Sequence, residues 1–207
     1  MSLDESTRQQ IDELLQSNKV MLFMKGNRQA PQCGFSATVI QILETLTPEY
    51  QTADVLSDPD LREGIKAYSS WPTIPQLYVR GEFIGGCDII QELFGSGELH
   101  EKLGIQLDLD VRPKITITDE AVEALREATA GTGSDGRELH LAIDARYQAT
   151  LAMAPRAEND IEIDANGIAL LIDALSAQRA DGIRIETADT PRGTAFKIEN
   201  PNAPEES

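Results

Sequence analysis

The segment VMLFMKGNRQAPQCGFS occupies residues 20–36 and combines a structural signal with a chemical one. Its first five residues form a continuous apolar run, which is typical of a strand buried on both faces. The segment ends in Cys33-Gly34-Phe35-Ser36, and beyond it apolar residues recur at helical spacing until Pro48. A buried strand, a loop with one cysteine and a helix therefore follow one another along the chain.

The loop has one thiol where a redox protein usually has two. A Cys-x-x-Cys pair attacks a disulfide and then releases itself by closing its own bridge. Ser36 replaces the second sulfur here, so this motif cannot resolve a mixed disulfide formed at Cys33. Either a group from elsewhere resolves it, or the Cys33 thiolate serves as something other than an electron carrier.

The remaining first half continues this alternation of helices and strands. The order that the patterns predict is α-β-α-β-α-β-β-α, a small α/β sheet with helical cover. Asp58-Pro59 is a typical helix start, and Arg80-Gly81-Glu82 separates two strands of an expected hairpin. The expected helices lie in 3–15, 39–46 and 59–68, with one or two closing helices in 89–99, and the expected strands lie in 20–24, 50–55, 76–79 and 83–84.

The second half predicts a β-rich α+β unit. Thr118 is a suitable N-cap for a helix that follows a short strand, and Asn166-Gly167 is a strong hairpin signal. We expect a first domain at 1–104, a linker at 105–114, a second domain at 115–202 and a tail at 203–207. The expected strands of the second domain lie in 115–117, 139–143, 150–153, 161–163, 168–172, 183–185 and 195–198.

Composition limits the classes of function. The formal net charge of −17 disfavours nucleic acid and anionic membrane as partners. No apolar run approaches the roughly 20 residues that span a bilayer, and the acidic N-terminus does not resemble a signal peptide. Two cysteines do not make a disulfide scaffold. We expect a soluble, cytoplasmic protein with a catalytic or metal-binding thiol.

Other segments of the first half carry residues suited to ligand binding. Residues 71–76, Trp-Pro-Thr-Ile-Pro-Gln, place two prolines before a strand, where a cis peptide bond fits. Residues 85–88, Gly-Gly-Cys-Asp, form a turn with few side chains at a helix start, so the backbone can approach a ligand closely. Arg62 and Lys66 can hold a carboxylate. Lys25 and the start of the following helix favour the thiolate form of Cys33.

Residues 5–104 resemble the monothiol glutaredoxins of the Cys-Gly-Phe-Ser class. The resemblance rests on four elements in the family's order and spacing, at residues 24–26, 33–36, 71–76 and 85–88. It implies a thioredoxin-like fold with Pro75 in cis and a glutathione-binding groove beside Cys33. It also implies the binding residues, which are Lys25, Cys33, Phe35, Arg62, Ile74, Cys87 and Asp88.

The resemblance assigns a part of glutathione to most of these residues. Lys25 and Arg62 would face its glycine carboxylate, and the main chain of Ile74 would pair with its cysteinyl backbone. Cys87 and Asp88 would bind the γ-glutamyl end at a helix start. Cys87 is open to other interpretations, since it can line the glutathione site, resolve a mixed disulfide at Cys33, or serve packing alone.

The number of available ligands favours one function. A [2Fe–2S] cluster needs four ligands, usually thiolates, and one chain offers only Cys33 at this groove. Two chains and two glutathione thiols would complete the set, as the resemblance implies. We therefore expect a homodimer in the cluster-bound state that transfers the cluster to iron–sulfur apoproteins or cluster-assembly proteins, with Cys33 as metal ligand. The alternative is a glutathione-dependent thiol–disulfide oxidoreductase that removes glutathione from proteins, with Cys33 as the catalytic residue and weak turnover.

Residues 115–202 resemble a degenerate A-type iron–sulfur carrier domain of the HesB-like kind. The resemblance rests on residues 115–121, the β-rich middle and the closing segment at 193–202 with its Phe-x-x-x-Asn-Pro-Asn. The cysteines that this family uses are absent from the corresponding positions, so no cluster ligand is expected in this half. Partner binding or self-association is the expected role.

Overall fold

The computed structural model describes residues 3–130, 136–157, 159–190 and 193–204. The chain divides into two compact units, Met1–Gln106 and Leu107–Ser207. The boundary falls inside the segment 105–114 that was predicted as a linker. Of the predicted tail, residues 205–207 lie outside the described residues.

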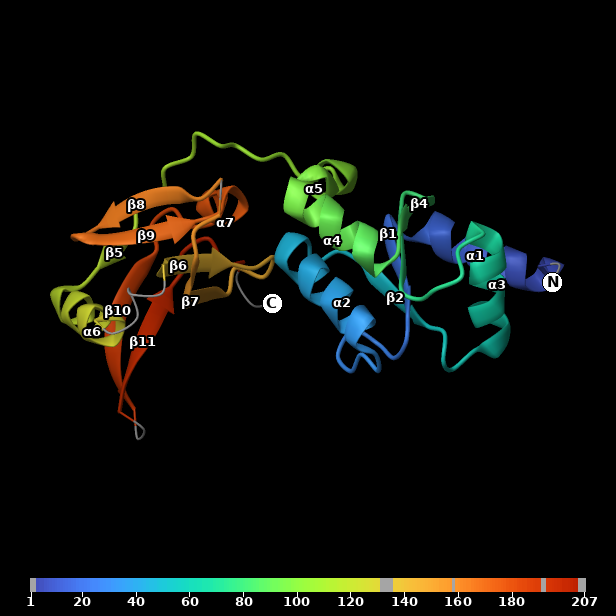
Figure 1. The fold of residues 1–207 in the computed structure, drawn as a ribbon, viewed down its shortest axis with the longest axis horizontal. Helices are drawn as coiled ribbons and strands as arrows, with labels where there is room; N and C mark the ends of the chain where they lie inside the picture. Colours follow the sequence, from blue (N-terminus) through green and yellow to red (C-terminus); the bar gives the residue numbers. More distant parts are fainter. Residues whose placement is uncertain (1–2, 131–135, 158, 191–192, 205–207) are drawn as a thin grey trace. The chain divides into compact units, whose positions relative to one another are not determined.

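The first unit is an α/β domain with the predicted order of elements (Figure 1). Its four-stranded sheet has the strand order β2-β1-β3-β4, with β1 parallel to β2 and antiparallel to β3. The strands are β1 (Val20–Met24), β2 (Gln51–Asp54), β3 (Gln76–Val79) and β4 (Glu82–Gly85). The helices are α1 (Glu5–Ser17), α2 (Gly34–Leu46), α3 (Pro59–Ser69), α4 (Cys87–Ser96) and α5 (Glu98–Leu103).

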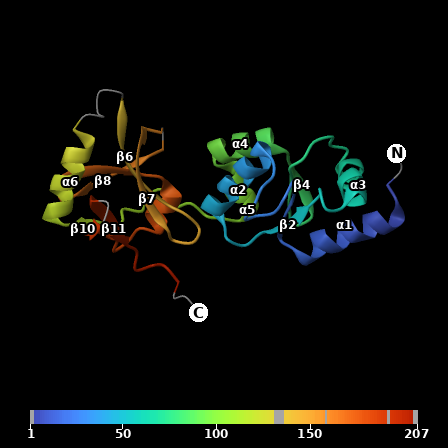
Figure 2. The same ribbon diagram turned by 90° about the horizontal axis from the view of Figure 1, so that it is seen from below.

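Helices cover both faces of this sheet, and the continuous apolar run of β1 is the reason. All five residues of β1 are buried, which requires cover on either side. Figures 1 and 2 show α1 and α3 on one face and α2 with α4 on the other. This arrangement places the starts of α2 and α4 on the same side of the sheet.

Local signals that the sequence contains are confirmed at several positions. The Asp58 side chain accepts a hydrogen bond from the Leu61 N–H at 2.9 Å and caps α3. The peptide bond between Ile74 and Pro75 is cis. The strands β3 and β4 form the predicted hairpin, in which Arg80 and Gly81 adopt positive φ angles of 52° and 80°.

The second unit is β-rich and contains two sheets, with strand orders β11-β10-β5 and β7-β6-β9-β8. One apolar core lies among their buried residues and those of two helices. The helices are α6 (Asp119–Thr129) and α7 (Ala174–Gln178). The strands are β5 (Thr116–Ile117), β6 (Arg137–Ile143), β7 (Ala149–Pro155), β8 (Ile161–Ala165), β9 (Ile168–Ile172), β10 (Arg184–Thr190) and β11 (Gly193–Glu199).

Turn and cap signals in the second unit are confirmed. Thr118 caps α6 by accepting a hydrogen bond from the Ala121 N–H. Asn166 and Gly167 have φ angles of 54° and 76° and join antiparallel β8 and β9, as a two-residue hairpin requires.

Two features of the second unit differ from the sequence prediction. The five-residue helix α7 was not predicted, because it is too short for helical periodicity to be visible; its cap, Asp173, accepts hydrogen bonds from Leu175 and Ser176 N–H. The end of the predicted linker also belongs to this unit. Val111 packs against its core and Pro113 is buried.

The closing Asn-Pro-Asn segment holds the chain end in place. The Asn200 side chain donates a hydrogen bond to the Arg179 carbonyl at 3.1 Å. The Asn202 side chain donates to the Asp181 carbonyl at 2.7 Å. These amides satisfy carbonyl groups just after α7, so this motif has a structural role in the second unit.

Candidate functional site around Cys33

Cys33 lies at the N-cap position of α2, at the end of the loop that connects β1 to this helix. Its backbone is extended, with φ −154° and ψ 138°, and its carbonyl accepts the first helical hydrogen bond from Ala37 N–H at 2.9 Å. The thiol makes no capping hydrogen bond, and the residue is partly exposed. A sulfur at this position meets the positive end of the helix dipole and is accessible to a ligand.

Ser36 is fully buried in the first turn of α2, although it occupies the position of a second redox cysteine. Its hydroxyl oxygen accepts a hydrogen bond from the Lys25 N–H at 3.3 Å. This contact ties the end of β1 to the helix that carries Cys33. In the sequence Ser36 shows only as a missing sulfur, and its structural role is not visible there because the contact joins residues distant in the sequence.

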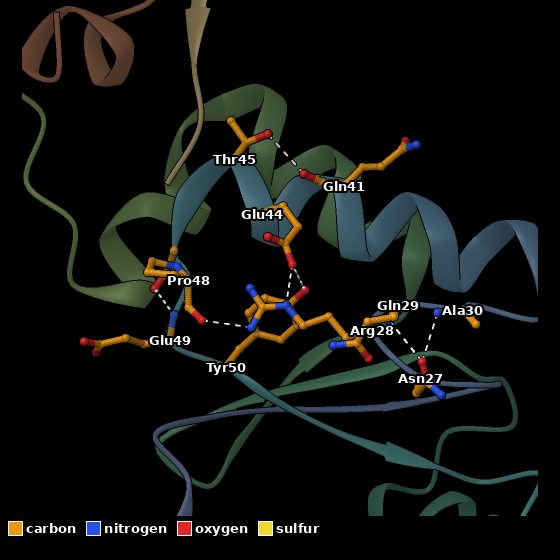
Figure 3. A network of polar contacts seen from close by, with 11 residues as sticks. Asn27, Arg28, Gln29, Ala30, Gln41, Glu44, Thr45, Pro48, Glu49 and Tyr50 are labelled. Atoms are coloured by element: carbon orange, nitrogen blue, oxygen red, sulfur yellow. Dashed lines mark hydrogen bonds and ion pairs between the residues drawn. The ribbon is translucent and has the colours of Figure 1, made fainter. Parts of the chain in front are cut away.

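The loop between Lys25 and Cys33 is fixed by its own contacts (Figure 3). The Asn27 side-chain oxygen accepts hydrogen bonds from Gln29 and Ala30 N–H at 3.0 and 2.9 Å. The Gln32 N–H then donates to the Lys25 carbonyl at 2.9 Å, which closes the loop at its base.

Arg28 anchors the tip of this loop to the far end of α2. Its guanidinium pairs with Glu44, donates to the Pro48 carbonyl at 3.0 Å and lies 4.1 Å from the Tyr50 ring centroid. The Tyr50 hydroxyl donates to the same Glu44 carboxylate at 2.6 Å. Arg28 was not predicted to have a role, and its signal in the sequence is a lone cation inside an otherwise uncharged loop.

The turn before β3 is organised by a buried glutamine. Gln76 is fully buried, and its amide nitrogen donates to the carbonyl groups of Trp71 and Thr73 at 3.0 and 3.1 Å. Its amide oxygen accepts from the Tyr78 hydroxyl at 3.3 Å. Gln76 therefore shapes the segment that carries Ile74 and the cis bond, and a polar residue at the start of an apolar strand was the sequence signal for it.

This turn lies against the start of α4. A methyl group added at Gly86 would lie 3.0 Å from Nε1 of Trp71 and 3.5 Å from the Pro75 carbonyl oxygen. The close approach explains the need for glycine at this position. No side chain caps α4 at Gly86, so its first N–H groups are available to a ligand.

Cys87, the first residue of α4, is a buried thiol near Cys33. Its Sγ lies 3.5 Å from the Gln91 side-chain oxygen. Burial raises the pKa of Cys87, and the negative charges of Asp88 and of ionised Cys33 raise it further. Both cysteines are free in this structure. The two thiols therefore differ, with Cys33 partly exposed and Cys87 buried and held protonated.

The remaining predicted residues lie on several elements of the first unit. Phe35, in the first turn of α2, is 60% exposed, and Asp88 is exposed at the start of α4. Lys25 is partly exposed at the end of β1. Arg62 lies on α3, and no hydrogen bond or ion pair joins it to Lys25, Cys33 or Cys87 among the described residues. Its Nε is buried without a hydrogen-bond partner there, as is Nε1 of Trp71.

Two cavities of the first unit are not lined by any of the predicted site residues. One of about 540 Å³ is lined by residues of α1, Tyr68 and the β3–β4 turn. The other, of about 330 Å³, lies between α2 and α4 and shares only Gln91 with the surroundings of Cys87. Within the described ranges, no three His, Cys, Asp or Glu side chains gather as a metal site, and no helix is long and apolar enough to cross a membrane.

Comparison with known proteins identifies the class of the first unit. A glutaredoxin family model matches residues 20–84. The monothiol glutaredoxin ycf64-like of Synechocystis is 54% identical over 105 residues, which cover 51% of this chain and 98% of that protein. A solved structure of reduced poplar apo GrxS14 is 50% identical, with a TM-score of 0.46, and covers 50% of this chain and 95% of that chain.

The chain belongs to the monothiol glutaredoxin family through its first unit. The chloroplastic monothiol glutaredoxin-S7 of rice is a further relative, 56% identical over 96 residues, which cover 46% of this chain and 57% of that protein. The family match does not extend to the second unit, so its likeness to A-type carriers stays a prediction.

Proposed function

We propose that this chain binds glutathione beside Cys33, shares a [2Fe–2S] cluster with a second copy and delivers that cluster to apoproteins. The observation that carries the proposal is the inequality of the two thiols. Cys33 is partly exposed at a helix start, whereas Cys87 is 8% exposed and has a raised pKa. The chain therefore supplies one accessible thiol at this site, and a cluster needs four ligands.

Glutathione binding is supported by groups that lack partners among the described residues. The buried Nε of Arg62 has no hydrogen-bond acceptor there, and a carboxylate is the acceptor that a guanidinium prefers. The uncapped start of α4 offers N–H groups to a second carboxylate, and exposed Asp88 can pair with an ammonium group. The main chain of Ile74, next to the cis bond to Pro75, would pair with the cysteinyl backbone of glutathione. These features match a tripeptide with two carboxylates and one amine.

The cluster is cargo in this proposal, and two copies of the chain share it. Each copy would contribute the Cys33 thiolate and one bound glutathione thiol, which gives the four sulfur ligands. A cluster held partly by exchangeable glutathione is suited to transfer to apoproteins. Phe35, exposed beside Cys33, would cover one side of it.

Anaerobic reconstitution of the full chain with iron, sulfide and glutathione tests the proposal. We expect a coloured species of dimer mass with visible absorption and circular dichroism that depend on glutathione. Cys33→Ser should abolish the colour, while Cys87→Ser, the matched control, should retain most of it. A Cys33→Ser protein that assembled the same cluster would disprove the assignment of Cys33 as ligand.

The alternative function, removal of glutathione from protein thiols, uses the same groove. In that reaction the Cys33 thiolate attacks the glutathione sulfur of a mixed disulfide and releases the protein thiol, and a second glutathione then resolves the new disulfide. Ser36 cannot take part in resolution, since resolution of a mixed disulfide requires a thiolate and Ser36 has only a hydroxyl. Turnover close to that of a dithiol glutaredoxin in a deglutathionylation assay would favour this alternative over cluster transfer.

We also propose a role for the second unit and a location for the protein in the cell. The second unit supports the first as an association module, since the sequence at 115–202 lacks cysteine altogether. A cytoplasmic location would keep Cys33 reduced. Fractionation of the native host with an antibody against the chain would test the location, because the rice relative is chloroplastic.

A further inference from the structure

The edge strands of the sheets differ in charge, and one of them has no charged residue. Natural sheets protect exposed edges with charged side chains, short strands or bulges. Among the described edges, β2, β4, β8 and β11 each carry at least one acidic residue, and β5 has only two residues. The seven residues of β7, Ala-Thr-Leu-Ala-Met-Ala-Pro, carry no charge. Apart from Pro155 at its last position, this strand has none of these protections among the described residues.

The structure leaves β7 open on its outer side. It pairs with β6 along its whole length and with no other strand among the described residues (Figure 1). Ala149 and Leu151 pack against the core, and none of the seven residues is buried. Thr150 and Ala152 are exposed. Every second residue of such a strand presents N–H and C=O groups outward, without a partner.

We propose that β7 pairs with β7 of a second copy of this chain in antiparallel fashion, about a twofold axis at Ala152. Such pairing joins the two four-stranded sheets into one. In this register Ala152 opposes its own copy, Leu151 opposes Met153, and Thr150 opposes Ala154. Uncharged side chains meet throughout, so no like charges oppose each other.

The net charge explains why the occupant is a second copy. Two chains that each carry a charge of −17 repel each other, and this repulsion is weakest where the surface has no acidic groups, as along β7. A basic partner, in contrast, would be attracted to the acidic edges and not to β7. The strand is also self-complementary, which a twofold interface requires.

This inference rests in part on the proposed function, because the pairing of β7 would bring the Cys33 residues of two copies together. An association module raises the effective concentration of the linked first units. The pairing itself requires neither iron nor glutathione. Its test therefore uses the full-length protein without a cluster, so that failure of pairing and failure of cluster binding give different results.

Sedimentation velocity of the full chain with substitutions at Ala152 tests the pairing. Ala152→Lys and Ala152→Asp each place two like charges opposite each other, so each should raise the dimer dissociation constant about fivefold or more. An effect of overall charge would instead have opposite signs for the two variants. Thr194→Lys and Thr194→Asp, at an exposed position of β11, are the matched controls and should leave dimerisation unchanged. Far-UV circular dichroism checks that each variant folds.

A cross-linking experiment identifies the register and the occupant. Residues that face each other across an antiparallel pair have Cα atoms about 4.5–5.5 Å apart, within the range of a disulfide. In a Cys33→Ser/Cys87→Ser background, Ala152→Cys should form a covalent dimer with diamide, which takes up the two electrons and two protons, and Thr194→Cys should not. A monomeric wild-type protein would overturn the proposal. Equal dimerisation of all charge variants, with no cross-link formed by the Ala152→Cys variant, would overturn it as well.

Discussion

At position 36 the chain carries a hydroxyl where a two-cysteine motif would place a sulfur, and that hydroxyl is fully buried. It accepts the Lys25 N–H, so it is part of the joint between β1 and α2. A thiol is a weaker acceptor than a hydroxyl, so restoring a cysteine here would weaken that joint. The single-thiol chemistry and the local structure therefore favour the same residue at this position.

The Cys87 thiol allows a prediction about pH at the residue scale. Its pKa is raised above the ordinary value of 9.0 by burial and by Asp88, so the folded chain holds the proton more tightly than the unfolded chain. The associated stability is present below about pH 9 and is lost as the pH rises through the folded pKa. In Cys33→Ser protein, the rate of iodoacetamide alkylation should increase with pH at higher values than in the same protein unfolded in urea.

Asp88→Asn supplies the control for this titration. Removal of the carboxylate takes away one of the charges that raise the Cys87 pKa, so the alkylation profile should move toward lower pH. A folded profile that coincides with the unfolded one would show that Cys87 is not held protonated. The thiol could then serve as a resolving group for Cys33.

Among the elements, the loop at residues 27–31 and helix α2 form a connected structure. Arg28 links the loop to Glu44 and Tyr50 near the end of the helix, while Ser36 links the helix start to β1. The helix that positions Cys33 is thus held at both ends. The loop itself is held by the Asn27 side chain and by the hydrogen bond between Gln32 and Lys25 at its base.

Arg28→Ala should lower the free energy of unfolding by about 1–3 kcal/mol, because it removes a partly buried ion pair and a cation–π contact. Urea unfolding followed by fluorescence measures this, since Trp71 is the sole tryptophan of the chain and lies in the first unit. Arg8→Ala is the control of equal charge. Arg8 is exposed and lies 5.7 Å from the Tyr68 ring centroid, so its change should stay within about 0.5 kcal/mol. Equal effects of the two variants would contradict the role of Arg28.

At the scale of the whole molecule, the chain consists of two units with separate apolar cores. The Synechocystis relative is matched over 98% of its own length by about half of this chain. A protein of that size therefore contains the first unit alone. The second unit is an addition to a domain that is complete without it.

A chain that ends at Gln106 should therefore fold. Its urea midpoint by Trp71 fluorescence should equal that of the full chain, because the first unit is compact and has an apolar core of its own. Self-association should be lost, because the truncated chain lacks β7. A truncated chain that unfolded at a clearly lower urea concentration would show that the second unit stabilises the first.

The positions of most elements could be predicted, because a helix and a strand differ in the period of their apolar residues. Asn166-Gly167 and Asp58-Pro59 indicated their turn and cap by local chemistry. The contributions of Arg28 and Gln76 were not predictable in this way. Their partners lie elsewhere in the chain or depend on a turn that forms only in the fold.

By itself the sequence determined that the chain offers two sulfurs in cysteine, a Cys-Gly-Phe-Ser loop before a helix and a second half without cysteine. These are properties of residue type and order, and folding does not change them. Only the tertiary structure decided that Ser36 is a buried acceptor, that Cys87 is the protected thiol, and that β7 is an uncharged edge. Burial, strand order and long-range hydrogen bonds depend on which distant residues meet, and that is settled by packing.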